Sequence, residues 1–202
     1  MQLVVVRHGR TAWNAERRFQ GHTDVPLDDE GRAQATALAA LLAAETFASA
    51  VTSDLARAQE TARIVLGART LPLRIDPDWR EMRFGTWEGL TWPEIVAAHP
   101  ELDAANETAP RVYTPSGGES FDDLCARIDT ALARVIRETP DDGSALIATH
   151  AGPLHAMLRV LLGGDQADAL KVRFLTASVS RFARVDGRWS LAALNQTGYE
   201  PA

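Results

Sequence analysis

Leu3-Val4-Val5-Val6-Arg7-His8-Gly9 is the segment of this 202-residue chain that says most about its fold class. Four apolar residues without polar alternation predict a strand that is buried on both faces, as in a parallel sheet. Arg7 and His8 follow this strand at once. Because ligands of open α/β sheets bind outside the carboxyl ends of the strands, the stretch predicts an α/β protein with a polar site at the end of its first strand.

The rest of the chain continues this alternation of strands and helices. Short apolar runs predict further strands over residues 47–52, 73–75 and 145–148. Apolar residues near helical spacing and end signals predict helices over residues 27–44, 55–66, 119–138 and 153–162. We expect Ser53 or Asp54 to cap the second of these helices, Gly67 to end it, and Pro153 to occupy the first position of the last. A hairpin of residues 178–185 and 189–194 closes on Asp186-Gly187.

Residues 79–118 break the alternation. They hold Trp79, Trp87 and Trp92, four prolines and the pair Gly117-Gly118. This composition predicts an insertion with a short helix over residues 93–99, lying over one end of the sheet like a lid. No repeat or linker divides the chain, so we expect a single domain over residues 1–202.

Composition excludes several classes of protein. The formal charge of −6 argues against a general nucleic-acid binder, which would be basic. No stretch reaches the roughly 18 apolar residues of a membrane span, and the first residues lack the pattern of a signal peptide. Cys125 is the only cysteine, which fits a reducing compartment. We therefore expect a cytoplasmic protein that binds neither membranes nor nucleic acids.

Residues suited to binding an anion stand at three predicted strand ends. Arg7 and His8 follow the first strand, Arg57 lies in the first helical turn after the second, and His150 follows the strand at 145–148. Guanidinium groups and free N–H groups of a helix terminus both favour phosphate. We therefore expect these residues to bind a small anion.

Five segments of the chain resemble the histidine phosphatase superfamily, which has the phosphoglycerate-mutase-like fold, and its phosphatase branch in particular. They are VVVRHGRTAWN (4–14), GHTDVPLDDEGRAQA (21–35), SDLARAQETA (53–62), REMRFGTWEG (80–89) and THAGP (149–153). A lone Arg-His-Gly triplet would be weak, but five segments in this order are specific. The resemblance covers about residues 2–200. It implies a three-layer α/β/α fold with a mostly parallel central sheet.

The resemblance also implies a role for each matched residue. His8 would be the nucleophile that carries a phosphohistidine. Glu81 would protonate the leaving alcohol and then activate water, and Glu88 is its rival in the same segment. The implied phosphate ligands are Arg7, Arg57, His150, Asn14 and Thr23. The implied substrate is a small anionic phosphoester, and no metal or cofactor is implied. Phosphoryl transfer depends mainly on neutralising oxygen charge and on in-line placement, which these residue types suit.

The chain also departs from the family pattern, at Arg10, Arg83, Ala151 and residues 153–155. These departures leave the implied mechanism intact but leave the substrate open. We hypothesise that Arg83, Arg111 and Tyr113, in or beside the insertion, help to select an acidic phosphorylated metabolite. We interpret His22, His99 and His155 as non-catalytic, and Cys125 as a core residue.

Three alternative functions stay open at this point. A cofactor-dependent phosphoglycerate mutase would use the same phosphohistidine, although the sequence after Glu81 is typical of the phosphatase branch. A metal-dependent phosphoesterase would need clustered carboxylates and histidines, whereas arginines stand at these strand ends. A non-catalytic phosphate-binding module is the third. Dimers occur in the superfamily, so both a monomer and a homodimer are compatible with the sequence.

Overall fold

A mostly parallel sheet forms the centre of the molecule. The computed structural model describes residues 1–102, 113–164 and 166–201. Its described residues form one six-stranded sheet in the order β3-β2-β4-β1-β5-β6. The strands are β1 (Gln2–Arg7), β2 (Ser49–Thr52), β3 (Leu73–Ile75), β4 (Ser144–Thr149), β5 (Ser178–Val185) and β6 (Arg188–Thr197). The first four strands pair in parallel, and β5 and β6 are antiparallel additions beside β1.

Strand β1 lies between β4 and β5 in this sheet. The side chains from Leu3 to Val6 are fully buried. Leu3 and Val5 belong to one hydrophobic core, whereas Val4 and Val6 belong to a second core on the opposite face. Burial on both faces is the reason that the strand has no polar alternation, as predicted.

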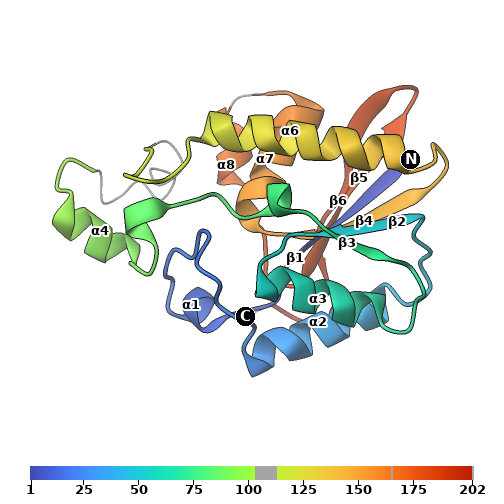
Figure 1. Cartoon of the computed structure of the whole chain (residues 1–202), viewed down its shortest axis with the longest axis horizontal. Coiled ribbons are helices and arrows are strands. Elements are labelled where there is room, and N and C mark those ends of the chain that lie inside the picture. The colour runs from blue at the N-terminus through green and yellow to red at the C-terminus, as the bar shows by residue number, and fades with distance from the viewer. Residues whose placement is uncertain (103–112, 165, 202) are drawn as a thin grey trace.

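Helices cover both faces of the sheet, which gives three layers (Figure 1). On one face lie α2 (Asp29–Leu41) and α3 (Ala56–Leu66), and on the other lie α6 (Phe121–Glu138) and α7 (Ala151–Leu162). The short helices are α1 (Ala12–Ala15), α4 (Trp92–Ala98), α8 (Gln166–Lys171), and the 3-10 helices η1 (Pro77–Trp79) and η2 (Gly85–Trp87). The three-layer α/β/α fold is therefore confirmed.

Two predicted helix starts are wrong. Leu55 is the N-cap of α3 and makes no side-chain cap bond, and the amide of Ala56 donates to Oδ1 of Asp24. The hydroxyl of Ser53 accepts a hydrogen bond from the Leu55 amide instead, and the Asp54 carboxylate pairs with Arg80. Pro153 is the third residue of α7, because the helix begins directly after β4 with His150 as its N-cap. The prediction that Gly67 ends α3 is confirmed.

The segment after β3 runs along the end of the sheet. It contains η1, η2 and α4, and α4 lies with α1 at the side of the molecule to which β1 leads (Figure 1). Trp79 and Trp87 are buried in the core that also contains α6 residues. Residues 103–112 of the expected insertion lie outside the described part of the chain, and its role as a lid stays a prediction. No described helix is long and apolar enough to cross a membrane.

Candidate active site

His8 lies directly after β1, with 2% of its surface exposed. Its Nδ1 atom lies 2.7 Å from the carbonyl oxygen of Gly9. A carbonyl can only accept a hydrogen bond, so Nδ1 carries the proton and Nε2 keeps its lone pair. Burial, together with the charges of Arg57 and Arg7, holds the pKa of His8 well below its usual range. His8 is therefore a neutral imidazole with Nε2 available as a nucleophile.

His150 follows β4, the neighbour of β1, and its ring centroid lies 5.0 Å from that of His8. The Nε atom of Arg57 donates to Nδ1 of His150 over 3.2 Å. Since Arg57 can only donate, the proton of a neutral His150 must be on Nε2. Burial and the charge of Arg57 lower the pKa of His150 well below its usual range. Its Nε2 atom is buried without a partner among the described residues, which leaves a donor for an anion.

Arg57 belongs to the first turn of α3 and is fully buried. Its two terminal nitrogens donate to the carbonyl oxygens of Thr23, at 2.9 Å, and Gly21, at 2.8 Å. Burial lowers the pKa of Arg57 to about 10, while the charges of Glu81 and Asp24 act in the opposite direction. The guanidinium stays charged at neutral pH and is fixed on three sides.

Arg7 supplies a second guanidinium from the end of β1. Its NH1 atom donates to the carbonyl oxygen of Phe174 over 2.5 Å. The charge of Arg7 lowers the pKa of both His8 and His150, so all three groups share one electrostatic environment. Two guanidinium groups and two neutral imidazoles at the carboxyl ends of adjacent strands form a site suited to a tetrahedral anion.

Glu81 lies in the irregular chain between η1 and η2, and 9% of its surface is exposed. Its Oε1 atom accepts hydrogen bonds from the amides of Met82 and Gly152, both at 2.8 Å. Gly152 belongs to the first turn of α7, directly after His150 and Ala151. The bond to Gly152 ties the carboxylate to the helix that follows His150, and the charge of Glu81 raises the pKa of Arg57.

Glu88, the alternative candidate for the acid, has a carboxylate that binds the loop of residues 21–23 and the amide of Phe84. Its Oε1 atom accepts from the amides of His22 and Phe84, and its Oε2 atom accepts from the amide and the hydroxyl of Thr23. A Cβ atom at Gly21 would lie 2.1 Å from Oε1 of Glu88. Glu88 therefore holds the loop whose carbonyl oxygens hold Arg57, and sequence reasoning had no signal for this role.

The other predicted phosphate and specificity residues lie around this centre. The Oδ1 atom of Asn14 accepts from the amide and hydroxyl of Thr11 at the start of α1. Asn14 and Arg7 line a cavity of about 380 Å³ that also reaches Arg173. Arg83 and Tyr113 are exposed, and Arg111 lies outside the described residues. The phosphate and substrate roles assigned to these side chains stay predictions.

The remaining histidines and the cysteine are placed as follows. His22 donates from Nε2 to the carbonyl oxygen of Glu81 over 2.9 Å, and burial lowers its pKa. His155 lies between the carbonyl oxygens of Ala151 and Val172, and His99 beside Glu101. Cys125 is buried in the core, where burial raises the pKa of its thiol.

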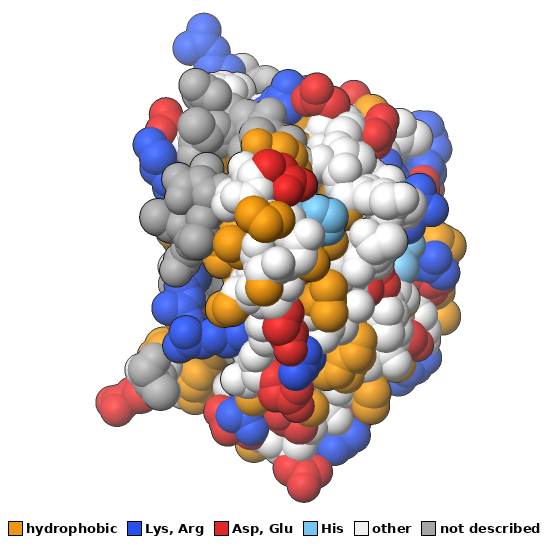
Figure 2. All heavy atoms as spheres, turned by 90° about the vertical axis from the view of Figure 1, so that its left-hand side faces the viewer, with side chains coloured by type: hydrophobic (Ala, Val, Ile, Leu, Met, Phe, Trp, Pro, Cys, Tyr) orange, Lys and Arg blue, Asp and Glu red, His pale blue; other side chains and the backbone are white. Residues whose placement is uncertain are grey.

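The surface at this end of the molecule mixes charges of both signs. Figure 2 shows the side on which α1 and α4 lie, and acidic, basic and apolar side chains are interspersed there. Across residues 1–102, 113–164 and 166–201, no three His, Cys, Asp or Glu side chains form a group that could hold a metal ion. The positive charge of the candidate site comes from the buried Arg57 and the half-buried Arg7, within a chain of net charge −6.

Known proteins resemble this chain over nearly its whole length. A sequence model of the histidine phosphatase superfamily (branch 1) matches residues 3–197. Phosphoglycerate mutase-like protein 4 of Arabidopsis thaliana is 39% identical over 209 aligned positions, which cover 98% of this chain and 89% of that protein. A metal-independent phosphoserine phosphatase of the same organism is 35% identical, covering 93% of this chain and 78% of that protein. The chain spans 54% of the length of three mycobacterial relatives that are 34% identical.

Solved structures show the same similarity. A mycobacterial glucosyl-3-phosphoglycerate phosphatase in complex with VO3 superposes with a TM-score of 0.87. It is 32% identical to this chain, and the match covers 96% of this chain and 98% of that structure.

Proposed function

Because the chain belongs to branch 1 of the histidine phosphatase superfamily, a family that includes phosphatases, we propose that it hydrolyses a small phosphomonoester through a phosphohistidine on His8. The observation that carries this proposal is the state of His8. It is a neutral imidazole whose Nδ1 proton is bonded to the Gly9 carbonyl. Its ring lies 5.0 Å from that of His150, whose Nε2–H has no partner among the described residues, and the charges of Arg57 and Arg7 act on His8.

In the first half-reaction, Nε2 of His8 attacks phosphorus in line with the bond to the leaving oxygen. The P–N bond forms as the P–O bond breaks, and the leaving oxygen takes the bonding pair and a proton from Glu81. The guanidinium groups of Arg7 and Arg57 and the Nε2–H of His150 hold the equatorial oxygens, whose charge must be stabilised in the transition state. The products of this step are an alcohol and the phosphohistidine.

In the second half-reaction, Glu81 takes a proton from water, and the water oxygen attacks the phosphorus of the phosphohistidine. The P–N bond breaks, its electron pair returns to Nε2 of His8, and inorganic phosphate leaves. Glu81 is then protonated for the next cycle, and no redox partner or added cofactor is needed. The use of one carboxyl group as acid and then as base follows from microscopic reversibility.

We propose an acidic phosphoester as the substrate class. Two similar proteins are named for phosphoserine and for a phosphoglycerate glycoside, and both compounds carry a carboxylate. The exposed Arg83 lies two residues after Glu81 and would face the part of the substrate beyond the phosphate. A screen of phosphorylated metabolites, scored by kcat/KM, should favour acidic over uncharged esters. Equal preference in wild-type protein and in Arg83→Ala would contradict the role of Arg83.

A phosphoglycerate mutase is the second candidate, favoured by the name of the Arabidopsis relative. It would share the first half-reaction and return the phosphoryl group to a sugar acid instead of water. Product analysis with 3-phosphoglycerate separates the two activities. Our proposal expects release of inorganic phosphate, whereas formation of 2-phosphoglycerate without phosphate release would favour the mutase.

The decisive experiment measures hydrolysis of p-nitrophenyl phosphate with and without His8. Wild-type protein should turn over this ester, keep its activity in EDTA, and be inhibited by orthovanadate, which mimics the trigonal-bipyramidal transition state. His8→Ala should lose at least about 10³-fold in kcat while keeping a cooperative unfolding transition. Substantial activity in a folded His8→Ala variant, or loss of wild-type activity in EDTA, would refute the nucleophile or the metal independence respectively.

A further inference from the structure

The candidate acid Glu81 lies on a stretch of chain that secondary structure does not support. Residues 80–84 join η1 to η2 and belong to no helix or strand. Their backbone N–H and C=O groups therefore need partners from other parts of the molecule. A general acid must also be held close to its working position, since a displacement of about 1 Å can cost 10²-fold in rate.

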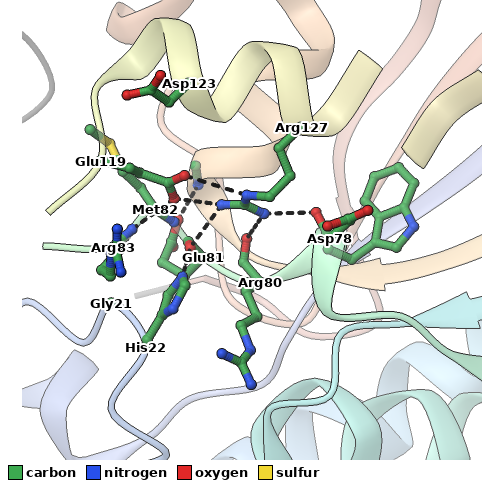
Figure 3. A network of polar contacts seen from close by, with 12 residues as sticks. Gly21, His22, Asp78, Arg80, Glu81, Met82, Arg83, Glu119, Asp123 and Arg127 are labelled. Atoms are coloured by element: carbon green, nitrogen blue, oxygen red, sulfur yellow. Dashed lines mark hydrogen bonds and ion pairs between the residues drawn. The ribbon is translucent and has the colours of Figure 1, made fainter. Parts of the chain in front are cut away.

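Arg127 of α6 supplies partners for the backbone at the start of this stretch and just before it (Figure 3). Its NH1 atom donates to the carbonyl oxygens of Asp78, at 2.7 Å, and Arg80, at 3.0 Å. Its NH2 atom donates to the carbonyl oxygen of Glu81 over 3.3 Å. One guanidinium thus binds three carbonyl oxygens within four consecutive residues, the last of which belongs to Glu81 itself.

Glu119 completes the same arrangement just before α6. It forms an ion pair with Arg127, and the two side chains are only 11% and 18% exposed. Its Oε1 atom also accepts from the amide of Arg83 at 2.9 Å, and its own amide donates to the carbonyl of Arg83 at 3.0 Å. The pair therefore holds the chain on both sides of Glu81. The guanidinium of Arg127 can bind several carbonyl oxygens at once because its donors are planar and permanently charged.

We propose that the Arg127–Glu119 pair positions the general acid Glu81, an inference that rests on the proposed function. Neither side chain is assigned a contact with the substrate or with the phosphate. Their effect reaches the chemistry through the backbone of residues 78–83. Loss of the pair should therefore impair the steps that need a proton from Glu81 and spare the binding of the phosphate.

The test compares esters that differ in their need for an acid. An alkyl phosphate has a poor leaving group and needs the proton, whereas p-nitrophenyl phosphate hardly needs it. Glu81→Gln is the reference and should lower kcat/KM for the alkyl ester far more than for the nitrophenyl ester. Arg127→Met should shift the same ratio by about 10- to 100-fold. Arg127→Lys, which keeps the charge without the fork, should shift it less.

Two further measurements separate positioning from general damage. The inhibition constant of vanadate should stay within about twofold of wild type in Arg127→Met, because the phosphate ligands are untouched. Arg134→Met is the matched control. Arg134 lies on the same helix and pairs with Asp76 and Asp78, at 27% side-chain exposure, but bonds no carbonyl of residues 80–83 among the described contacts. It should lose stability and keep the wild-type ratio.

The outcomes distinguish this inference from the proposed function. If Glu81→Gln shifts the ratio and a folded Arg127→Met does not, the positioning role is overturned while the proposed function stands. If Glu81→Gln leaves the ratio unchanged, the acid assignment fails and the positioning role fails with it. Should Arg127→Met not fold, Glu119→Gln replaces it, since this change keeps the side-chain size and removes the charge. An unchanged ratio there would equally refute the proposal.

Discussion

Gly9 and Arg57 decide which ring nitrogen of each site histidine carries a proton. The Gly9 carbonyl can only accept, so it fixes the proton of His8 on Nδ1, and the Arg57 Nε–H can only donate, so it fixes the proton of His150 on Nε2. The two rings thus hold opposite tautomers 5.0 Å apart. One is suited to attack phosphorus and the other to donate to its oxygens.

Glu88 offers a test of how the phosphate site is held. Because it accepts four hydrogen bonds from loop 21–23 and Phe84, Glu88→Ala should loosen the carbonyl groups that fix Arg57. We expect vanadate to bind about 10-fold more weakly, which is the loss of one charge-assisted hydrogen bond.

Glu94→Ala is the matched control for this prediction. Glu94 also accepts bonds from a nearby turn and pairs with Arg18, but it lies at the start of α4, away from Arg57. Vanadate inhibition should not change in this variant. An unchanged vanadate constant in Glu88→Ala would show that the loop holds its shape without Glu88.

The sequence predicted the candidate residues better than it predicted their partners. Residue types and strand ends were enough to select His8, Arg57 and His150, because parallel strands bring their carboxyl ends to one edge. They could not separate the duties of Glu81 and Glu88, which are seven residues apart in one irregular segment. Arg127 lies one helical turn from both Leu124 and Ala131, on the buried stripe of α6. A charged residue on such a stripe is the signal in the sequence that points to a buried polar partner.

Among the elements, buried strands and the hairpin were the easiest to predict. The turn of the hairpin has positive φ at both Asp186, at 50°, and Gly187, at 76°, which matches its Asp-Gly sequence. Helix starts were harder, because α3 begins within four residues of the end of β2 and α7 within two residues of the end of β4. There the backbone direction is set by the sheet, and capping signals such as Ser53 and Pro153 lose their usual position.

The start of α7 carries a prediction of its own. A Cβ atom at Gly152 would lie 2.2 Å from Oε1 of Glu81, so Gly152→Ala must push the carboxylate away from the helix terminus. We expect a folded protein in which kcat/KM for alkyl phosphates falls at least about 10-fold more than for p-nitrophenyl phosphate. The free energy of unfolding should change little, because the higher helix propensity of alanine, about 1 kcal/mol over glycine, offsets the cost of displacing the Glu81 carboxylate.

Ala151→Gly is the control for this effect, because it changes helix propensity in the same turn without adding an atom near Glu81. Thermal unfolding of both variants reports the propensity term separately. If Gly152→Ala leaves the ratio of the two esters at the wild-type value, the contact between the helix terminus and Glu81 does not position the acid.

The whole molecule makes the site possible by burying it between two cores. One core joins the sheet to α6 and α7, and the other joins it to α2 and α3. His8 and His150 follow β1 and β4, and Arg57 lies in the first turn of α3. All three side chains are almost fully buried. Charged and titratable groups that are buried in this way couple the chemistry to the stability of the fold.

This coupling predicts how stability depends on pH. Burial and the charges of Arg57 and Arg7 hold the pKa of His8 and His150 below the ordinary value of 6.5. Below pH 6.5 these two histidines are therefore protonated in the unfolded chain but stay neutral in the folded protein. The free energy of unfolding should therefore fall as pH drops below 6.5, by up to about 1.4 kcal/mol per pH unit for each histidine, and should gain nothing from these groups above it. Urea unfolding at pH 7.5, 6.5 and 5.5 measures this slope. The double variant His8→Asn/His150→Asn should have a flatter slope than either wild type or a variant of the exposed His99, and equal slopes would mean that neither ring stays neutral on folding.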